Sequence, residues 1–406
     1  MAAGEEQVGG ERRPRGRIAL VLAGGGARGA YEMGVLSVLA PVLEERGEEV
    51  EIIVGTSIGG INAAFLAANA HRPLSEAAAR GEEVWRGLQY RSAMRSIISP
   101  AGLLFLIRFV GTLLSLPVKA VPSLLDTAPL RETLNRVIEF ARIPINVADD
   151  ASPLHAVGVV ATSYETGRSL VFHQGGETPP TNEVRAIDYV EARLTNTHVL
   201  ASGAIPVIFP AVEVTEPASC RGWYGDGGLR LNAPLDPALE LGADRVIVVG
   251  LNSAVIPDDA PEPTQPDLFD GASSLLSVLA DQLNSDVATL TAMNDAIEDG
   301  SGVGPRKIPY MFIVPSDRLT IGRIAVDVYK RRYGTIRAIL RTPNLALLGR
   351  ITDAARNPMH GELYSYLFLC REFVDEMIAL GRADAQRWLD ADHDEWPWRI
   401  GSPVEV

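Results

Sequence analysis

Two glycine-rich motifs carry the residues of this chain whose types and spacing point most directly to chemistry. Ser57 lies in Gly55-Thr56-Ser57-Ile58-Gly59, which fits the G-x-S-x-G pattern of a nucleophile held at a sharp strand-to-helix turn. Upstream, Gly24-Gly25-Gly26-Ala27-Arg28-Gly29 offers small residues whose N–H groups can converge on an anion in front of a helix. A nucleophile beside an anion-binding loop is the minimum that acyl transfer requires.

The segments around the motifs predict the elements that hold them. Residues 17–23 and 50–54 are short apolar runs rich in β-branched residues, and each is followed by a helix-like stretch. Residues 245–250 form a continuous apolar run typical of a strand buried in a parallel sheet. Residues 156–172 predict a hairpin, and residues 310–315 could add a last strand. The sequence therefore predicts an α/β fold.

Each motif has another interpretation. Gly24, Gly26 and Gly29 also match G-x-G-x-x-G, the dinucleotide-binding fingerprint. That interpretation requires an acidic residue at the end of the next strand, whereas residues Glu48–Glu51 precede or begin it. Ser57 could likewise be an idle serine in a tight turn. The two motifs together favour the nucleophile.

A serine nucleophile needs a base. Of the six histidines, His198 is the best placed, but none lies in a glycine-rich loop at a strand end. Asp226 is the more attractive base because it stands between glycines after an aromatic strand. An ordinary Asp-Gly turn is the alternative. A carboxylate with a pKa of ~3.9 is a weak base at neutral pH, which suits esters better than amides.

These motifs, in this order, resemble those of the patatin-like phospholipase family. Residues 22–31 resemble its oxyanion-hole loop and residues 54–60 its nucleophile elbow. Residues 201–210 match its central motif, and residues 224–235 match the motif with its catalytic aspartate. The sequence departs from many members at Ala23, where an aspartate is common.

The resemblance implies a three-layer sandwich with a mostly parallel central sheet flanked by helices, plus a helical C-terminal extension. It implies a catalytic dyad of Ser57 and Asp226, with no triad histidine, no metal and no cofactor. The backbone donors that it implies for the oxyanion are Gly24, Gly25, Gly26, Ala27 and Arg28, together with Ile58. The glycines of its motifs correspond to Gly29, Gly55, Gly59, Gly227 and Gly228.

The implied activity is hydrolysis of fatty-acyl esters of phospholipids or lysophospholipids through an acyl-enzyme. An acyltransferase or thioesterase with the same dyad is the alternative, as is a non-catalytic lipid-binding protein. The Arg28 side chain could pair with a substrate phosphate or be a solvated residue of the first helical turn.

Composition narrows the partners and the compartment. The chain has 406 residues, 47% of them hydrophobic, two cysteines and a net charge of −14. Such acidity argues against nucleic acid as a partner, and so few cysteines do not suggest a disulfide framework. We expect a cytoplasmic protein, with peripheral contact to the inner face of the membrane as an open alternative.

Three segments are expected along the chain: a disordered tail over residues 1–15, a catalytic domain over 16–255, and a C-terminal region over 256–406. Residues 101–118 form an apolar stretch with a single charge. We expect them to contact lipid as a lid or interfacial element, with a buried helix pair or a membrane anchor as alternatives.

The C-terminal region contains no chemistry that the sequence identifies. It is expected to begin with a linker, and a helix is predicted over about 267–297. An amphipathic stretch runs from Leu363 to Ile378. Packing against the sheet is the expected role of the region, and partner binding is the alternative.

Overall fold

The computed structural model describes residues 16–94, 127–206, 208–253, 255, 271, 282–297, 306–333, 345–346, 349–350 and 358–401. The expected tail (1–15) and the apolar segment 101–118 lie outside these ranges. Within the described part, every helix is too short or too polar to cross a bilayer.

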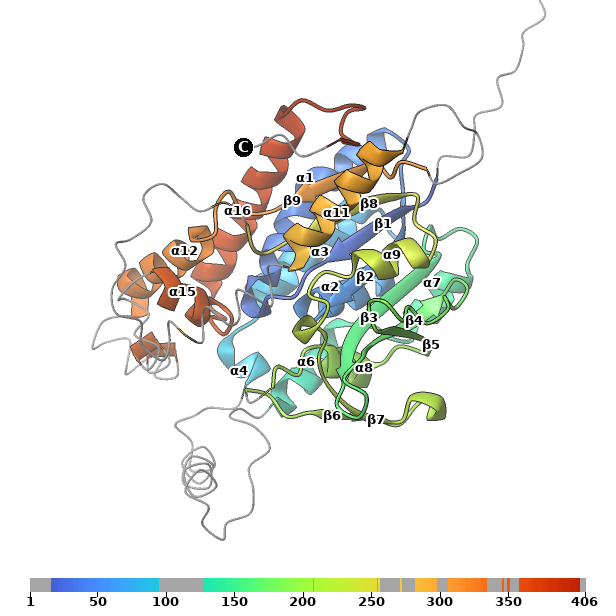
Figure 1. Ribbon diagram of the computed structural model, residues 1–406. Coiled ribbons are helices and arrows are strands. Elements are labelled where there is room, and N and C mark those ends of the chain that lie inside the picture. The colour runs from blue at the N-terminus through green and yellow to red at the C-terminus, as the bar shows by residue number, and fades with distance from the viewer. Residues whose placement is uncertain are drawn as a thin grey trace, which may run out of the picture.

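A mixed sheet forms the centre of the molecule, with strands in the order β5-β4-β3-β2-β1-β8-β9 (Figure 1). All neighbours along this order are parallel except β3 and β4. The strands are β1 (Ile18–Leu22), β2 (Val50–Thr56), β3 (Ala156–Ser163), β4 (Ser169–Gly175), β5 (Ile187–Glu191), β6 (Val212–Val214), β7 (Gly222–Asp226), β8 (Arg245–Val249) and β9 (Tyr310–Ile313). The predicted α/β class with a mostly parallel sheet is confirmed.

Helices cover both faces of the sheet (Figure 1). On one face lie α1 (Ala30–Glu45), α2 (Ile58–Ala68), α3 (Leu74–Gly87) and α16 (Arg371–Asp390), and on the other α9 (Leu235–Glu240) and α11 (Gln282–Ala296). The remaining helices are α4 (Tyr90–Ala93), α6 (Ala128–Val137), α7 (Arg142–Ala148), α8 (Asn196–Ser202), α12 (Thr320–Val328) and α15 (Pro358–Ser365), with 3-10 turns η1 (Gly26–Gly29), η2 (Ala218–Cys220) and η3 (Gly227–Leu229) and a π-turn η4 (Tyr329–Tyr333). Because both faces are covered, β1 is buried along its whole length.

Strand β3 aligns the strand ends that carry the candidate residues. The last residue of β2, Thr56, pairs with Val160 in parallel. Strand β7 then takes over the same edge of β3 in antiparallel orientation, and Asp226 pairs with the next residue, Ala161. Ser57, which follows β2, and Asp226, which ends β7, therefore lie close together because their strands pair with consecutive residues of β3.

The amphipathic stretch predicted over 363–378 is not one helix, which corrects that expectation. Helix α15 ends at Ser365 and α16 begins at Arg371. Between them the Tyr366 carbonyl accepts a hydrogen bond from the Ala27 N–H (2.9 Å) instead of continuing a helical ladder. A contact across the fold thus overrides the local helical pattern.

Helix α16 packs closely on α1. A Cβ on Gly34 would lie 2.3 Å from the Ile378 carbonyl oxygen, and one on Gly381 would lie 2.2 Å from the Tyr31 carbonyl oxygen. Any side chain at these two positions would push the helices apart. The C-terminal helix is therefore an integral part of this layer.

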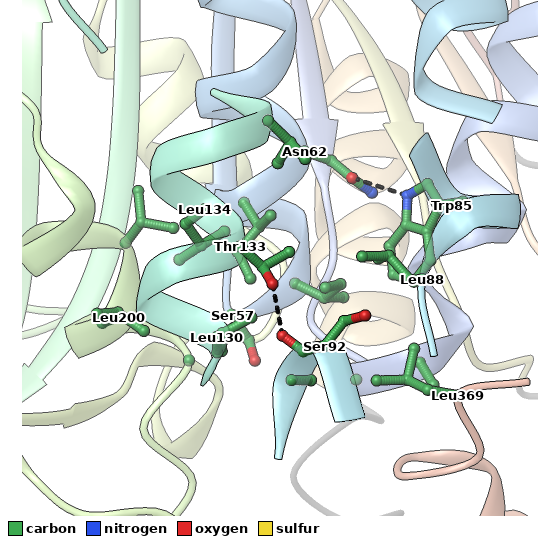
Figure 2. Close-up of a pocket in the computed structure, with 18 of the residues that line it drawn as sticks. Ser57, Asn62, Trp85, Leu88, Ser92, Leu130, Thr133, Leu134, Leu200 and Leu369 are labelled. Atoms are coloured by element: carbon green, nitrogen blue, oxygen red, sulfur yellow. Dashed lines mark hydrogen bonds between the residues drawn. The ribbon is translucent and has the colours of Figure 1, made fainter. Parts of the chain in front are cut away.

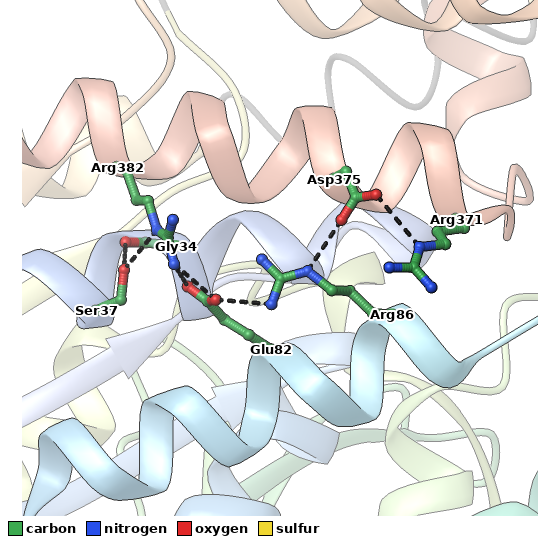
Figure 3. A network of polar contacts seen from close by, with 7 residues as sticks. All are labelled: Gly34, Ser37, Glu82, Arg86, Arg371, Asp375 and Arg382. Carbon is green, nitrogen blue, oxygen red and sulfur yellow. Dashed lines mark hydrogen bonds and ion pairs between the residues drawn. The ribbon is translucent and has the colours of Figure 1, made fainter.

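Charged side chains tie α16 to α3 and α1 as well (Figure 3). The Glu82 carboxylate on α3 accepts hydrogen bonds from Arg382 (2.7 Å to each oxygen) and lies 3.0 Å from Arg86. Arg86 in turn donates to Asp375 (2.9 Å), and Arg382 donates to Ser37 on α1 (3.0 Å). Glu82 is buried, whereas its partners are partly exposed.

We predict that Glu82→Ala lowers the free energy of unfolding by about 1–3 kcal/mol, because two arginines lose charged hydrogen-bond acceptors at the interface of α3 and α16. Equilibrium urea unfolding measures this. The control is Glu76→Ala, which removes the exposed Arg72–Glu76 pair on the same helix and should cost less than ~0.5 kcal/mol. Equal losses in the two variants would contradict the prediction.

Candidate active site

Ser57 occupies a strained turn between β2 and α2. Its backbone is left-handed, with φ 55° and ψ −120°, a region that a non-glycine residue adopts only when its surroundings impose it. The flanking glycines make the turn possible. A Cβ on Gly55 would lie 2.1 Å from the Gly59 carbonyl oxygen, and one on Gly59 would lie 2.2 Å from the Leu22 carbonyl oxygen. The G-x-S-x-G spacing is thus a steric requirement.

The Ser57 hydroxyl donates a hydrogen bond to Asp226, with 2.7 Å between Oγ and Oδ2. The other carboxylate oxygen, Oδ1, accepts from the Gly228 N–H (2.7 Å). Around this pair, the Ser57 N–H donates to Ser202 Oγ (2.8 Å), and Thr162 Oγ1 donates to the Asp226 carbonyl (2.9 Å). The two predicted residues therefore meet in hydrogen-bonding geometry, and each has its backbone fixed by a neighbouring side chain.

Burial sets the proton affinity of the carboxylate. Asp226 is 5% exposed, and burial raises its pKa to about 6, although the hydrogen bonds from Ser57 and Gly228 act in the opposite direction. Desolvation disfavours the charged form of a carboxyl group. Asp226 is therefore a stronger base than its ordinary pKa would allow, while it stays mostly ionised at neutral pH.

The six main-chain N–H groups expected at the oxyanion loop and the elbow are not equivalent. Gly24 donates to the Asn232 carbonyl (3.0 Å), Ala27 to the Tyr366 carbonyl (2.9 Å) and Arg28 to the Gly25 carbonyl (3.4 Å). Among the described residues, the N–H groups of Gly25, Gly26 and Ile58 have no acceptor. These three are the donors left for a ligand beside Ser57.

Neither expectation for the Arg28 side chain is correct. It is 1% exposed, so it is not a solvated residue of the first helical turn. It does not point to a free site for phosphate either, because Nη2 lies 2.6 Å from the Glu362 carboxylate and Nε donates to Ser365 Oγ (2.7 Å). Both partners come from α15, far along the chain, and no local pattern around Arg28 indicates them.

Two of the histidines, His198 and His173, form hydrogen bonds away from Ser57 and Asp226. The best placed in the sequence, His198, bonds through Nδ1 to Thr195 and through Nε2 to the Glu216 carbonyl (2.9 Å). His173 lies between the Gly175 carbonyl and the Thr178 hydroxyl. In the described part of the chain, no histidine is hydrogen-bonded to Ser57 or Asp226.

An apolar cavity of about 110 Å³ opens beside Ser57. Ser57 and the hydrogen-bonded Asn62–Trp85 pair are among the side chains that line it (Figure 2). Asn62 accepts from Trp85 Nε1 (3.1 Å) and donates to the Glu32 carboxyl group (2.6 Å), so its polar atoms are satisfied within the wall. The rest of the wall is mainly aliphatic, with Ile61, Leu88, Leu130, Leu134, Leu200 and Leu369 among its residues. A hydrocarbon chain fits this chemistry.

A second, smaller cavity meets the first at Ser57. It is lined by Asp226, Asn232, Tyr366 and the glycines Gly24, Gly25, Gly26 and Gly228. Two residues near Ser57 and Asp226, namely Ser202 and Tyr366, are not indicated as site residues by the sequence. Ser202 belongs to the motif at residues 201–210, but that motif gives no role for its hydroxyl. Tyr366 falls within an amphipathic pattern and no motif includes it.

A nucleophile-elbow serine bonded to a buried carboxylate, in an α/β fold beside an apolar pocket, is the arrangement typical of a serine hydrolase that acts on acyl groups. The family model of the patatin-like phospholipases matches residues 20–239. Since this is more than half of the chain, the protein belongs to the patatin-like phospholipase family.

Two curated relatives are similar to parts of the chain. The cGAMP-activated phospholipase of Pseudomonas aeruginosa is 33% identical over 220 residues, which cover 53% of this chain and 53% of the relative. The lysophospholipase nte1 of Aspergillus terreus is 50% identical over 60 residues, covering 14% of this chain and 4% of the relative. The matches therefore span about half of one relative and a small part of the other.

Among solved structures, VipD from Legionella pneumophila matches with a TM-score of 0.31 and 13% identity, covering 91% of this chain and 67% of that one. Human group IVD cytosolic phospholipase A2 matches with a TM-score of 0.33 and 11% identity, covering 92% and 60%. Similarity this low carries no argument about substrate.

We predict that covalent labelling of Ser57 by a fluorophosphonate slows tenfold per pH unit below about pH 6. If Asp226 accepts the serine proton, it must be ionised, and its raised pKa means that protonation removes this base as the pH falls through about 6. The second-order labelling rate is measured between pH 4.5 and 8, with tryptophan fluorescence to verify folding.

Asp226→Asn is the control for that measurement and should label slowly at every pH. A wild-type rate that stays constant from pH 8 down to pH 4.5 in folded protein would contradict the role of Asp226.

Proposed function

We propose that this protein hydrolyses fatty-acyl esters of phospholipids or lysophospholipids through an acyl-enzyme on Ser57, with Asp226 as the general base. The observation that carries the proposal is the 2.7 Å hydrogen bond between Ser57 Oγ and Asp226 Oδ2 beside the apolar cavity. Family membership supports the lipid substrate.

The first half of the reaction follows from the positions of the groups. As Ser57 Oγ attacks the ester carbonyl carbon, its proton moves to Asp226 Oδ2. The carbonyl oxygen becomes an oxyanion that the N–H groups of Gly25, Gly26 and Ile58 are available to stabilise. When the tetrahedral intermediate collapses, the C–O bond of the ester breaks. Asp226 then returns the proton to the leaving alkoxide, which leaves as the alcohol.

The second half uses the same groups on water. Asp226, ionised again, takes a proton from a water molecule that attacks the acyl carbon on Ser57. When this second intermediate collapses, the bond between the acyl carbon and Ser57 Oγ breaks and the fatty acid is released. Asp226 returns the proton to Oγ, which restores the serine hydroxyl. A base with a pKa of about 6 is better matched to proton transfer at neutral pH than a carboxylate of ordinary pKa.

The apolar cavity is the proposed site of the acyl chain. Ser57 is one of its lining residues, and its wall offers dispersion contacts and no unsatisfied hydrogen-bonding group at the Asn62–Trp85 pair. An acyl chain bound in this cavity can place its carbonyl carbon at Ser57, because Ser57 lines the same space (Figure 2). The smaller cavity beside Asp226 is left for the leaving alcohol.

Acyl transfer to an alcohol or a lysolipid with the same dyad is the second candidate, since the acyl-enzyme can react with acceptors other than water. Product analysis with added lysolipid or alcohol distinguishes the two activities.

Peripheral membrane contact through residues 101–118 also belongs to the proposal. Described residues before and after this segment line the acyl cavity: Ser92, Ala93 and Met94 before it, and Leu130, Thr133 and Leu134 after it. Co-sedimentation with phosphatidylcholine vesicles tests this contact.

We predict that Ser57→Ala and Asp226→Asn each reduce kcat/KM for a medium-chain p-nitrophenyl ester by at least ~10³-fold, because each removes a group that acts in bond making. The control is Ser169→Ala, which changes a buried serine on β4 and should keep wild-type turnover. Circular dichroism establishes that all variants are folded. Wild-type turnover by either dyad variant would exclude the mechanism.

A further pair of substitutions tests the acyl cavity. Leu88 lies on its wall beside Trp85 (Figure 2). Leu88→Trp should shift the preferred acyl chain to shorter lengths and Leu88→Ala to longer ones, by about fourfold in kcat/KM for each methylene group excluded or admitted. A series of p-nitrophenyl esters from C4 to C16 measures the shift. Two variants with the wild-type length profile would place the acyl chain elsewhere.

A further inference from the structure

The loop at residues 24–26, which bears two of the proposed oxyanion donors, has no side chains whose contacts could stabilise its conformation. Gly24, Gly25 and Gly26 have no side chains, and glycine is the residue with the most backbone freedom. Gly26 has a φ of +62°, in the left-handed region. At the end of the loop, the Arg28 N–H donates to the Gly25 carbonyl over 3.4 Å and closes one 3-10 turn. The other hydrogen bonds of the loop come from elsewhere in the fold.

Two main-chain hydrogen bonds frame the loop. On one side the Gly24 N–H donates to the Asn232 carbonyl (3.0 Å), within the family domain. On the other side the Ala27 N–H donates to the Tyr366 carbonyl (2.9 Å), well beyond that domain. Gly25 and Gly26, whose N–H groups have no acceptor among the described residues, lie between these two anchors. The second anchor is also close, since a Cβ on Gly26 would lie 2.3 Å from the Tyr366 carbonyl oxygen.

The side chain of Arg28 secures this second anchor. Its guanidinium donates to the Glu362 carboxylate (2.6 Å), the Glu362 carbonyl (2.6 Å) and Ser365 Oγ (2.7 Å), and lies 4.0 Å from the centroid of the Tyr366 ring. These contacts use the planar fork of arginine, which lysine cannot reproduce. Arg28 thereby binds the last turn of α15 and contacts Tyr366, the residue that follows this helix.

Glu362 is itself held in place. Its second carboxylate oxygen accepts from the Gly322 N–H of α12 (2.5 Å), and its side chain is 10% exposed. Two charges buried this deeply stabilise each other, because removal of one leaves the other without an opposite charge in a poorly solvated position. The ion pair thus connects α12 and α15 to the glycine loop.

We infer that the C-terminal segment from Glu362 to Tyr366 positions the oxyanion loop: Glu362 acts through Arg28, and the Tyr366 carbonyl acts through Ala27. These are positioning residues, since none of the contacts involves the reacting atoms. The inference rests on the proposed function, because it assigns the N–H groups of Gly25 and Gly26 to the transition state. It gives the C-terminal region a part in catalysis, beyond the packing expected from the sequence.

An oxyanion hole acts on the transition state more than on bound substrate, so displacement of the loop should lower kcat and leave KM nearly unchanged. We expect Glu362→Gln, which removes the charge and keeps the shape, to lower kcat for a p-nitrophenyl ester by about 10–100-fold, within the range for loss of oxyanion donors. Ser365→Ala removes a single acceptor of Arg28 and should give a smaller loss of kcat, about threefold to tenfold.

The matched control is Asp384→Asn. Asp384 is a buried carboxylate in the same C-terminal region, but it binds Tyr31 (2.9 Å) and Arg387 (2.6 Å) and does not contact the loop. This variant should lose stability and retain wild-type kcat per folded molecule. A purely structural role of Glu362 would instead give the same result for both variants, and that outcome would overturn the inference.

Four further results decide the remaining cases. If Glu362→Gln does not fold, Ser365→Ala decides, and a wild-type kcat there overturns the inference. A rise in KM at constant kcat in either variant also overturns it. Activity retained by Ser57→Ala would refute the proposed function itself, whereas an inactive Ser57→Ala with a fully active, folded Glu362→Gln would refute the positioning role alone.

Discussion

The alignment of β2 and β7 along the same edge of β3 is the constraint on which the rest of the site depends. Thr56 and Asp226 pair with consecutive residues of β3, Val160 and Ala161. The 2.7 Å distance between Ser57 and Asp226 follows from that register. Because side chains alternate between the two faces of a strand, a slip of one residue would turn the aspartate away from the serine.

Burial then gives the aligned carboxylate its chemical character. Asp226 has hydrogen bonds from Ser57 and Gly228 and no cation beside it among the described residues, so desolvation dominates and its pKa rises. A neighbouring arginine would hold the pKa down and weaken the base. The one arginine of the glycine motif, Arg28, is instead paired with Glu362. The fold thus keeps the positive charge of Arg28 away from Asp226, the proposed general base.

The same ion pair links two parts of the chain that sequence patterns treat separately. The family model ends at residue 239, yet Tyr366 lines both cavities at Ser57 and its carbonyl binds Ala27. Helix α16 packs on α1 through Gly34 and Gly381, and it is tied to α3, which lines the acyl cavity. The C-terminal region is therefore part of the walls and supports of the candidate site.

Local features of the fold could be predicted from the amino-acid sequence. The α/β class, the elbow at Ser57 and the turn at Asp226 are encoded by glycines and apolar runs that act within a few residues, which is why motifs could indicate them. Contacts in the folded chain set which N–H groups stay available, where the Arg28 guanidinium points and where the predicted helix breaks, at Tyr366. Each of these depends on a hydrogen bond or ion pair between residues far apart in the chain. Glu362, the partner of Arg28, and Tyr366, the partner of Ala27, are not marked by any local sequence pattern, because these contacts form only when distant parts of the chain come together in the fold.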